Sequence, residues 1–180
     1  FLDQFRRELN IPPSIADADQ IQVSPSPIFD HLRIILEEKV PILSVGLGDP
    51  TKLVEQAHAS GAKVMAMVTT VEETLKVEKG GVDVAVAQGS EAGGHRSSFQ
   101  LNTNGEEEVP MIGTLALIPQ IVDAVSIPVI AAGGIMDGRG LVASLALGAA
   151  GVLLGTRFMV ARESGTFQAY QQRMFEAKET

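Results

Sequence analysis

The sequence predicts an α/β fold of repeated βα units, arranged either as a doubly wound sheet or as part of a (β/α)8 TIM-type barrel. Three observations support this prediction. Short apolar, β-branched runs recur, and they are continuous rather than alternating, as is typical of parallel strands covered on both faces. Helical patterns lie between these runs. The runs start 22, 19, 46 and 23 residues apart, so only one interval is much longer than the others.

Five strands are expected, and they follow the apolar runs at 41–46, 63–68, 82–87, 128–133 and 151–156. A closed barrel of this type needs eight strands. On the barrel interpretation, three strands precede those seen here, and the chain covers roughly the last five βα units. The chain also begins with Phe1 rather than Met, within a helical pattern. We therefore expect residues 1–180 to form a partial barrel domain that lacks its N-terminal strands.

The helices are expected from signals at their ends. Asp49 with Pro50 is typical of a helix start, and Thr70-x-x-Glu73 is a capping box. Pro119 is expected either to kink its helix or to lie in the first turn. The expected helices span residues 25–40, 49–61, 70–80, 114–125, 137–148 and 163–178.

The composition excludes several classes of function. The net charge is −8 and the pI is about 4.8, which argues against binding to nucleic acid or to an anionic membrane surface. Because the chain has no cysteine, disulfides, thiolate metal sites and thiol nucleophiles are excluded. Its three histidines have no metal-ligand spacing, so no metal site is expected. No signal peptide or transmembrane run is found, and we expect a cytoplasmic location.

Glycine turns follow the last two predicted strands, at Gly133-Gly134 and at Gly155-Thr156. In TIM barrels the loops after the last two strands often bind phosphate. Glycine lets backbone N–H groups approach phosphate oxygens, and a helix N-terminus favours their negative charge. Glycines at strand ends also serve simply as turn residues. Neither a GxGxxG fingerprint nor a P-loop lysine is present, so the pattern predicts a nucleotide or flavin phosphate rather than ATP hydrolysis.

The one long interval contains a glycine-rich segment, Gln88 to Phe99, and a polar loop insertion at 97–110. Long loops in compact α/β proteins are often functional. His95 follows the third predicted strand, at the edge of the sheet where such barrels hold their chemistry. A histidine acts near neutral pH as a general base or as a cationic donor, and Glu91 would orient the imidazole or hold the loop. A loop histidine without a role is the alternative.

Three motifs resemble those of a known enzyme family. They are AQGSEAGGHRSSF at 87–99, IPVIAAGGIMDGRG at 127–140 and ALGAAGVLLGTRF at 146–158. In this order and spacing they resemble the nitronate monooxygenases, formerly called 2-nitropropane dioxygenases, from about Phe29 to the end of the chain. The FMN-dependent enoyl-acyl-carrier-protein reductases share the EAGGH-type loop and the glycine turns.

The resemblance implies an FMN-binding TIM-type barrel with a small extra helical domain, and it places the family's catalytic histidine on His95. The flavin-binding positions implied by the resemblance fall on Gln88, Gly89, Gly94, Ala132, Gly133, Gly134, Gly155 and Thr156. Two departures concern the flavin and its loop. Some members have a flavin-contacting lysine at a position that falls near Met67 of this chain, so that contact is not expected here. The family also often has glycine in place of Ser97.

The implied function is the FMN-dependent oxidation of alkyl nitronates by molecular oxygen, with a nitronate and O2 as partners and a homodimer as one option. The alternative within enzymes is an NADH- and FMN-dependent enoyl-acyl-carrier-protein reductase. The alternative from another class is a non-catalytic fragment that binds a phosphate ligand. The sequence leaves open whether His95 acts as a base or as a cation that holds the anionic nitronate.

Overall fold

The structure, a computed structural model, describes residues 28–99 and 110–178. The chain divides into two compact units, residues 1–35 and 36–180, and each is described by itself. In the first unit, the described residues belong to helix α2 (Ile28–Glu37), which carries Asp30 in its first turn, where a carboxylate interacts favourably with the helix dipole. The helix predicted at 25–40 is therefore present, and it ends at Glu37 rather than at residue 40. The helical pattern at the start of the chain lies outside the described residues.

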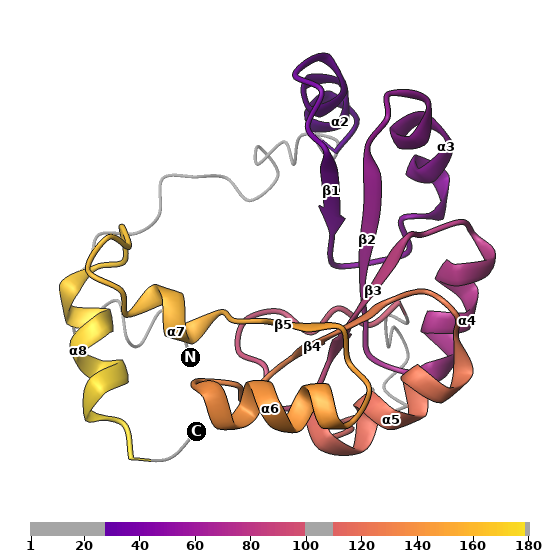
Figure 1. Cartoon of the computed structure of the whole chain (residues 1–180). Coiled ribbons are helices and arrows are strands. Elements are labelled where there is room, and N and C mark those ends of the chain that lie inside the picture. Colours follow the sequence, from indigo (N-terminus) through magenta and orange to yellow (C-terminus); the bar gives the residue numbers. More distant parts are fainter. Residues whose placement is uncertain (1–27, 100–109, 179–180) are drawn as a thin grey trace, which may run out of the picture. The chain divides into compact units, whose positions relative to one another are not determined.

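The second unit is built on a five-stranded parallel sheet (Figure 1). Its strands are β1 (Ile42–Val45), β2 (Lys63–Val68), β3 (Val84–Gln88), β4 (Val129–Ala132) and β5 (Gly151–Leu153). All neighbouring pairs are parallel, and the strands lie in chain order. In a doubly wound sheet the order reverses at a switch point, whereas in a (β/α)8 barrel successive strands are neighbours. The topology is that of consecutive βα units of a TIM-type barrel, which confirms the predicted fold class.

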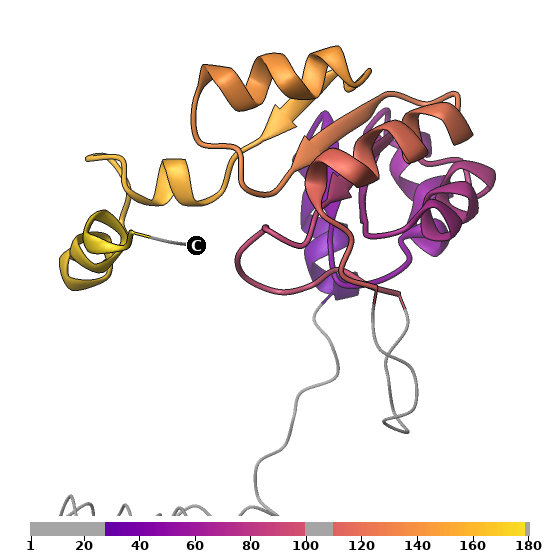
Figure 2. The ribbon, with the colours of Figure 1, turned by 90° about the horizontal axis from the view of Figure 1, so that it is seen from below.

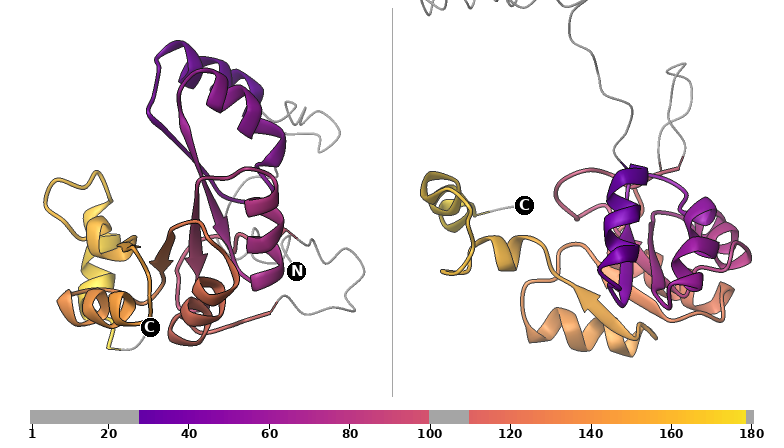
Figure 3. Two further views of the ribbon diagram at one scale, coloured as in Figure 1. Left: turned by 45° about the vertical axis from the view of Figure 1, so that its right-hand side comes forward. Right: turned by 90° about the horizontal axis from the view of Figure 1, so that it is seen from above.

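Helices alternate with the strands as predicted. They are α3 (Thr51–Ala59), α4 (Val71–Lys79), α5 (Thr114–Ala124), α6 (Gly138–Ala146), α7 (Thr156–Met159) and α8 (Gln168–Glu176). Helices α3 to α6 connect successive strands and lie on the same side of the sheet (Figures 2 and 3). A barrel requires this arrangement, because its strands enclose their own interior. None of the described helices is both long and apolar enough to cross a membrane.

The buried core lies between the sheet and its helices. On β2 the side chains of Val64, Ala66 and Val68 are fully buried, whereas Met65 and Met67 between them are partly exposed. This alternation follows from the period of two along a strand. One face of β2 packs against α3 and α4, and the other carries the two methionines.

Proline is accommodated in the middle of α5, so the expectation of a first-turn position is wrong. Pro119 is the sixth residue of this helix. Its missing N–H would have bonded to the carbonyl of Leu115, one turn earlier, so the helix gives up one backbone hydrogen bond at this point. Ile118 and Ile121, beside the proline in sequence, are fully buried and hold the helix against the sheet.

The last strand is shorter than predicted. Strand β5 ends at Leu153, and Thr156, expected within the strand, instead begins α7. The reason lies in Gly155, whose backbone angles (φ −95°, ψ −78°) lead into a helical turn. Its carbonyl accepts hydrogen bonds from the N–H groups of Phe158 (3.0 Å) and Met159 (3.1 Å). The predicted strand end was therefore wrong, although the turn lies where the sequence placed it.

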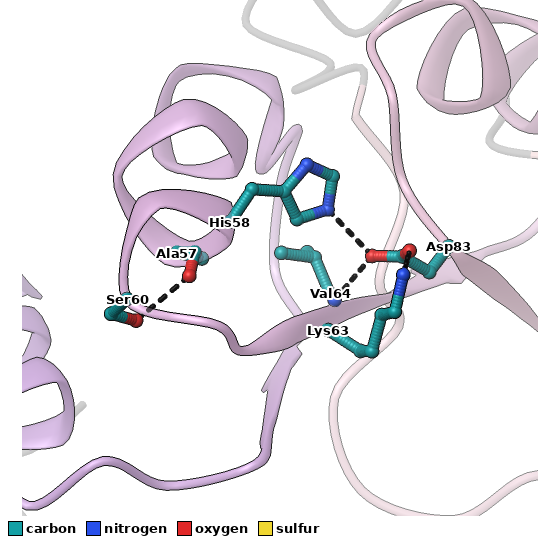
Figure 4. Close-up of polar contacts among 6 residues, drawn as sticks. All are labelled: Ala57, His58, Ser60, Lys63, Val64 and Asp83. Atoms are coloured by element: carbon teal, nitrogen blue, oxygen red, sulfur yellow. Dashed lines mark hydrogen bonds and ion pairs between the residues drawn. The ribbon is translucent and has the colours of Figure 1, made fainter.

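At the amino-terminal edge of the sheet, the carboxylate of Asp83 joins three segments of the chain (Figure 4). Its oxygens lie 2.7 Å from Nζ of Lys63 and 2.7 Å from Nε2 of His58, and one accepts the Val64 N–H at 2.8 Å. The Asp83 side chain is 17% exposed. Burial by itself raises the pKa of Asp83, but these hydrogen bonds outweigh it and lower that pKa to about 2. Asp83 thus fixes the approach to β3 against β2 and α3.

Candidate functional site

Three loops leave the sheet side by side at its carboxyl-terminal edge. The register pairs Gln88 with Ala132 and Ala132 with Leu153, so that β3, β4 and β5 end at the same level. The N–H of Gly89 donates to the carbonyl of Ala132 at 2.9 Å, and Ala132 itself is buried. The predicted site residues that follow these strands therefore lie at the same edge of the sheet. Residues 89–99, which follow β3, form the His95 loop.

The side chain of Gln88 bridges two positions of the His95 loop. Its Nε2 donates to the carbonyl of His95 and its Oε1 accepts the N–H of Ser97, both at 2.9 Å. Gln88 is 4% exposed, so both ends of a buried amide are satisfied by the loop backbone. The imidazole of His95 is exposed and has no hydrogen-bond partner among the described residues. The backbone of His95 is therefore fixed, while its ring is accessible.

Glu91 holds the loop, the second of the two roles expected for it. Its carboxylate accepts the backbone N–H of Thr114 at 2.8 Å and the hydroxyl of Thr114 at 2.9 Å. It thereby satisfies a free donor at the start of α5, as a capping side chain does. Burial raises the pKa of Glu91, but the donors from its own backbone and from Thr114 outweigh it, and the pKa is lowered.

Arg96, which the sequence reasoning missed, ties the loop back to the sheet. Its guanidinium donates to the carbonyl of Gln88 at 2.7 Å and to that of Pro110 at 3.0 Å. Its Nε is buried and has no partner among the described residues. Burial lowers the pKa of Arg96, and the charges of Glu73 and Glu91 oppose that effect without cancelling it. The signal in the sequence was a cation directly after the loop histidine.

Glu73 was recognised in the sequence only as part of a capping box. The Thr70 half of the box is present, because the Thr70 hydroxyl accepts the N–H of Glu73 at 3.2 Å. The Glu73 carboxylate does not return to the N-cap. It accepts the N–H of Thr69 at 2.6 Å and that of Phe99, at the end of the His95 loop, at 2.7 Å. The capping-box prediction was thus half right, because a tertiary partner competes for the carboxylate.

Two of the predicted flavin-binding glycines are also required by the packing of the protein. A Cβ atom on Gly89 would lie 2.6 Å from the backbone N and Cα of Thr114. A Cβ atom on Gly133 would lie 2.8 Å from the Thr114 hydroxyl and 3.0 Å from the N atom of Ala92, and φ of Gly133 is +117°. Gly134 also has a positive φ, of +66°. These turns exclude side chains whether or not a ligand lies beside them.

The other two glycines face open space. A Cβ atom on Gly94 or Gly155 would meet nothing within 4 Å, although Gly94 has a positive φ of +78°. Thr156 is exposed, and the N–H groups of Thr156 and Arg157, in the first turn of α7, have no acceptor among the described residues. An open depression of about 580 Å³ adjoins this turn and is lined by Gly155, Phe158, Met159, Ala161, Glu163 and Ser164.

These features suit an anionic group. Free backbone donors, a hydroxyl and a glycine without a neighbour together offer hydrogen bonds and room to an anion. Among the residues that the structure describes, no group of three or more metal-ligating side chains is found. Of the predicted polar insertion at 97–110, residues 100–109 lie outside the described residues.

Comparison with known sequences identifies relatives over the whole chain. The nitronate monooxygenase family model matches residues 7–180. A probable nitronate monooxygenase of Staphylococcus haemolyticus is 45% identical over 181 residues, which is 100% of this chain and 49% of that protein. A probable nitronate monooxygenase of Staphylococcus aureus is 41% identical with the same coverage. The chain thus spans about half the length of the curated relatives it matches.

Two solved structures of similar fold are also related in sequence. FabK from Thermotoga maritima has a TM-score of 0.75 and 37% identity, over 87% of this chain and 46% of that one. Nitroalkane oxidase from Streptomyces ansochromogenes has a TM-score of 0.73 and 36% identity, over 80% of this chain and 42% of that one. Both similarities cover most of this chain and less than half of the other.

Proposed function

The chain belongs to the nitronate monooxygenase family, and from this membership and the site geometry we propose that it forms part of an FMN-dependent enzyme that oxidises alkyl nitronates with molecular oxygen. One observation carries the proposal. An accessible imidazole, His95, lies on a fixed loop that packs beside the glycine turn after β4, at the same edge of the sheet as the turn after β5. This edge of a TIM barrel is where catalytic groups gather. The similarity to a nitroalkane oxidase supports the substrate class.

FMN is proposed to bind along the turns after β4 and β5. The Thr156 hydroxyl and the free N–H groups of the first turn of α7 would hold its phosphate, with room provided at Gly155. The remaining proposed contacts are backbone positions at Gln88, Gly89, Gly94, Ala132, Gly133 and Gly134. FMN bound there would supply the redox chemistry between the nitronate and oxygen.

His95 is proposed to act on the substrate directly. With a neutral nitroalkane, an imidazole nitrogen would take the proton from the carbon that bears the nitro group. With a nitronate, which is already an anion, the protonated ring would hold the negative charge through a hydrogen bond. Because the ring has no internal partner among the described residues, it is free for either role.

The proposed partners are the nitronate substrate and O2. The cytoplasmic location and the homodimer remain predictions from the sequence. The acidic net charge of −8 supports an enzyme of small molecules rather than a nucleic-acid-binding protein.

A second candidate function is the NADH-dependent reduction of an enoyl thioester, favoured by the similarity to FabK. The two functions differ in their reductant, because a nitronate is itself oxidised whereas an enoyl thioester must be reduced at the expense of NADH. Each reaction therefore has its own assay on the same purified protein.

The test uses the complete protein, purified without added flavin. We expect the visible absorption bands of bound FMN and oxygen consumption on addition of propyl nitronate. NADH with crotonyl thioester should be oxidised far more slowly than the nitronate. A colourless protein that gains no thermal stability from FMN would contradict the flavin proposal, and rapid NADH oxidation that depends on the enoyl thioester would favour the second candidate.

A further inference from the structure

Glu73 of α4 holds its carboxylate in the interior with no cation in contact among the described residues. It is 7% exposed, and each of its oxygens serves a different segment. Oε2 accepts the N–H (2.6 Å) and the hydroxyl (2.8 Å) of Thr69, in the turn between β2 and α4. Oε1 accepts the Ser98 hydroxyl (3.2 Å) and the Phe99 N–H (2.7 Å). A buried carboxylate is costly unless such bonds satisfy it, so the bridge is an integral part of this region.

Helix capping does not account for this arrangement. The Thr70 hydroxyl already serves as the N-cap acceptor of α4. Glu72 lies in the same first turn, is exposed, and supplies the negative charge that the helix dipole favours there. A buried second carboxylate is therefore not needed to start the helix. What distinguishes Glu73 from Glu72 is its contact with the end of the His95 loop.

The contacts of Gln88 and Glu73 together hold the backbone from the loop histidine to the end of the His95 loop. Gln88 holds the carbonyl of His95 and the N–H of Ser97. Glu73 holds the two residues that follow, Ser98 and Phe99. Since the His95 ring touches no hydrogen-bonding group among the described residues, its location is set by the backbone that carries it.

A second side chain of α4 contacts the same point. Lys76 places its Nζ 5.9 Å from the centroid of the Phe99 ring, within cation–π range, and its Nζ also lies 3.0 Å from the carboxylate of Asp49. The first turns of α4 thus contact the end of the His95 loop twice, through the buried hydrogen bonds of Glu73 and through the exposed cation–π contact of Lys76. Lys76 is 61% exposed, so the buried bridge of Glu73 is the stronger constraint.

We propose that Glu73 is a positioning residue of the active site, which holds the end of the His95 loop so that the imidazole lies where the substrate binds. The link to catalysis rests on the proposed function. The link to the loop does not, and it can be measured without substrate. No atom of Glu73 is assigned a chemical step.

The experiment compares Glu73→Ala with Glu72→Ala in the complete protein. Both remove a carboxylate from the first turn of α4, but only the first removes the contact with the loop. A third variant, Thr69→Val, deletes one hydrogen bond on the other oxygen of Glu73 and leaves the loop contact in place. Amide hydrogen exchange of residues 95–99 is measured by mass spectrometry without nitronate.

We expect Glu73→Ala to raise the exchange rate at residues 95–99 by about tenfold or more, because without the Glu73 carboxylate the loop opens without first breaking those hydrogen bonds. Glu72→Ala and Thr69→Val should leave it within about twofold of the parent, even where Thr69→Val lowers the melting temperature. Equal exchange in Glu73→Ala and the parent, or equal increases in all three variants, would overturn the proposal. Should Glu73→Ala fail to fold, Glu73→Asp supports the same comparison, since it keeps the charge but shortens its reach.

A second measurement separates positioning from general stability. Anaerobic reduction of the flavin by a nitronate should slow in Glu73→Ala at saturating substrate and stay unchanged in Thr69→Val. Equal slowing in both variants would contradict a positioning role. If the parent flavin is not reduced by nitronates at all, the proposed function fails, while the exchange result still decides the link between Glu73 and the loop.

Discussion

The carboxylate of Asp83 allows the strongest quantitative prediction about stability. Its folded-state pKa is about 2, against an ordinary value of 3.8, because donors from Lys63, Val64 and His58 outweigh its burial. Since each pKa unit corresponds to about 1.4 kcal/mol, ionised Asp83 contributes about 2 kcal/mol to the free energy of unfolding. The low exposure of the Asp83 side chain, 17%, limits solvent screening of these interactions.

The sign of the pH dependence follows from the lowered pKa. Because the unfolded chain binds the proton more tightly than the folded one, the contribution of Asp83 is fully present above about pH 4 and is lost as the pH falls towards 2. Asp83→Asn removes the titrating group. The free energy of unfolding should therefore fall by about 2 kcal/mol at pH 6, and the gap to the parent should narrow on acidification.

The assay is urea unfolding of the flavin-free complete protein between pH 6 and pH 2.5, followed by circular dichroism. Asp123→Asn is the matched control, since Asp123 is exposed and makes no ion pair among the described residues. We expect that control to differ from the parent by less than about 0.5 kcal/mol. A difference in the free energy of unfolding between the parent and Asp83→Asn that stays constant from pH 6 to pH 2.5 would show that the Asp83 carboxylate does not stabilise the fold in this way.

Three further predictions concern the His95 loop. Gly89→Ala should lower the free energy of unfolding by about 3 kcal/mol or more, because the new Cβ meets the backbone of Thr114. The control Gly93→Ala, whose Cβ would meet nothing within 4 Å, should lower it by less than about 1 kcal/mol. Equal effects of the two variants in urea unfolding would contradict this. Glu91→Gln should lower the free energy of unfolding by about 1–2 kcal/mol above pH 5, because it weakens the cap on α5. This loss should shrink in acid, because the Glu91 pKa is lowered in the folded protein. An unchanged loss at pH 3 would argue against this role of Glu91. Gln88→Leu should cost about 2 kcal/mol and raise amide exchange in the loop, and unaltered exchange would exclude the amide bridge as its anchor.

The strands and their parallel arrangement follow from local patterns in the sequence. Runs such as the one that forms β2 are apolar on both faces, and each is followed by a helix whose start and stop residues are in place. The end of β5 could not be placed, because Gly155 is compatible with an extended or a helical backbone and only the hydrogen bonds of α7 decide between them. The position of Pro119 within α5 could not be predicted either, because the loss of stability from a mid-helix proline depends on the surroundings of the carbonyl one turn earlier.

The site was predictable where its signal is local and not where it depends on distant contacts. The glycine-rich loop with His95 stands out because its residue types are unusual after a buried strand. The role of Glu73 does not, because its partner Phe99 is 26 residues away and a capping box explains the same spacing. Arg96 is marked in the sequence only as a cation directly after the loop histidine. Its partners are backbone carbonyls, which any sequence offers, so its role could not be predicted.

The proposed reaction of His95 and the flavin is measured by mixing the flavin-loaded complete protein with propyl nitronate in the absence of oxygen and following the flavin absorbance. We expect the flavin to be reduced. His95→Asn, which removes the imidazole without removing the loop, should slow this reduction by about 100-fold or more. Reduction at the same rate in the parent and in His95→Asn would contradict the assigned role of His95. A flavin that no nitronate reduces would contradict the proposed function.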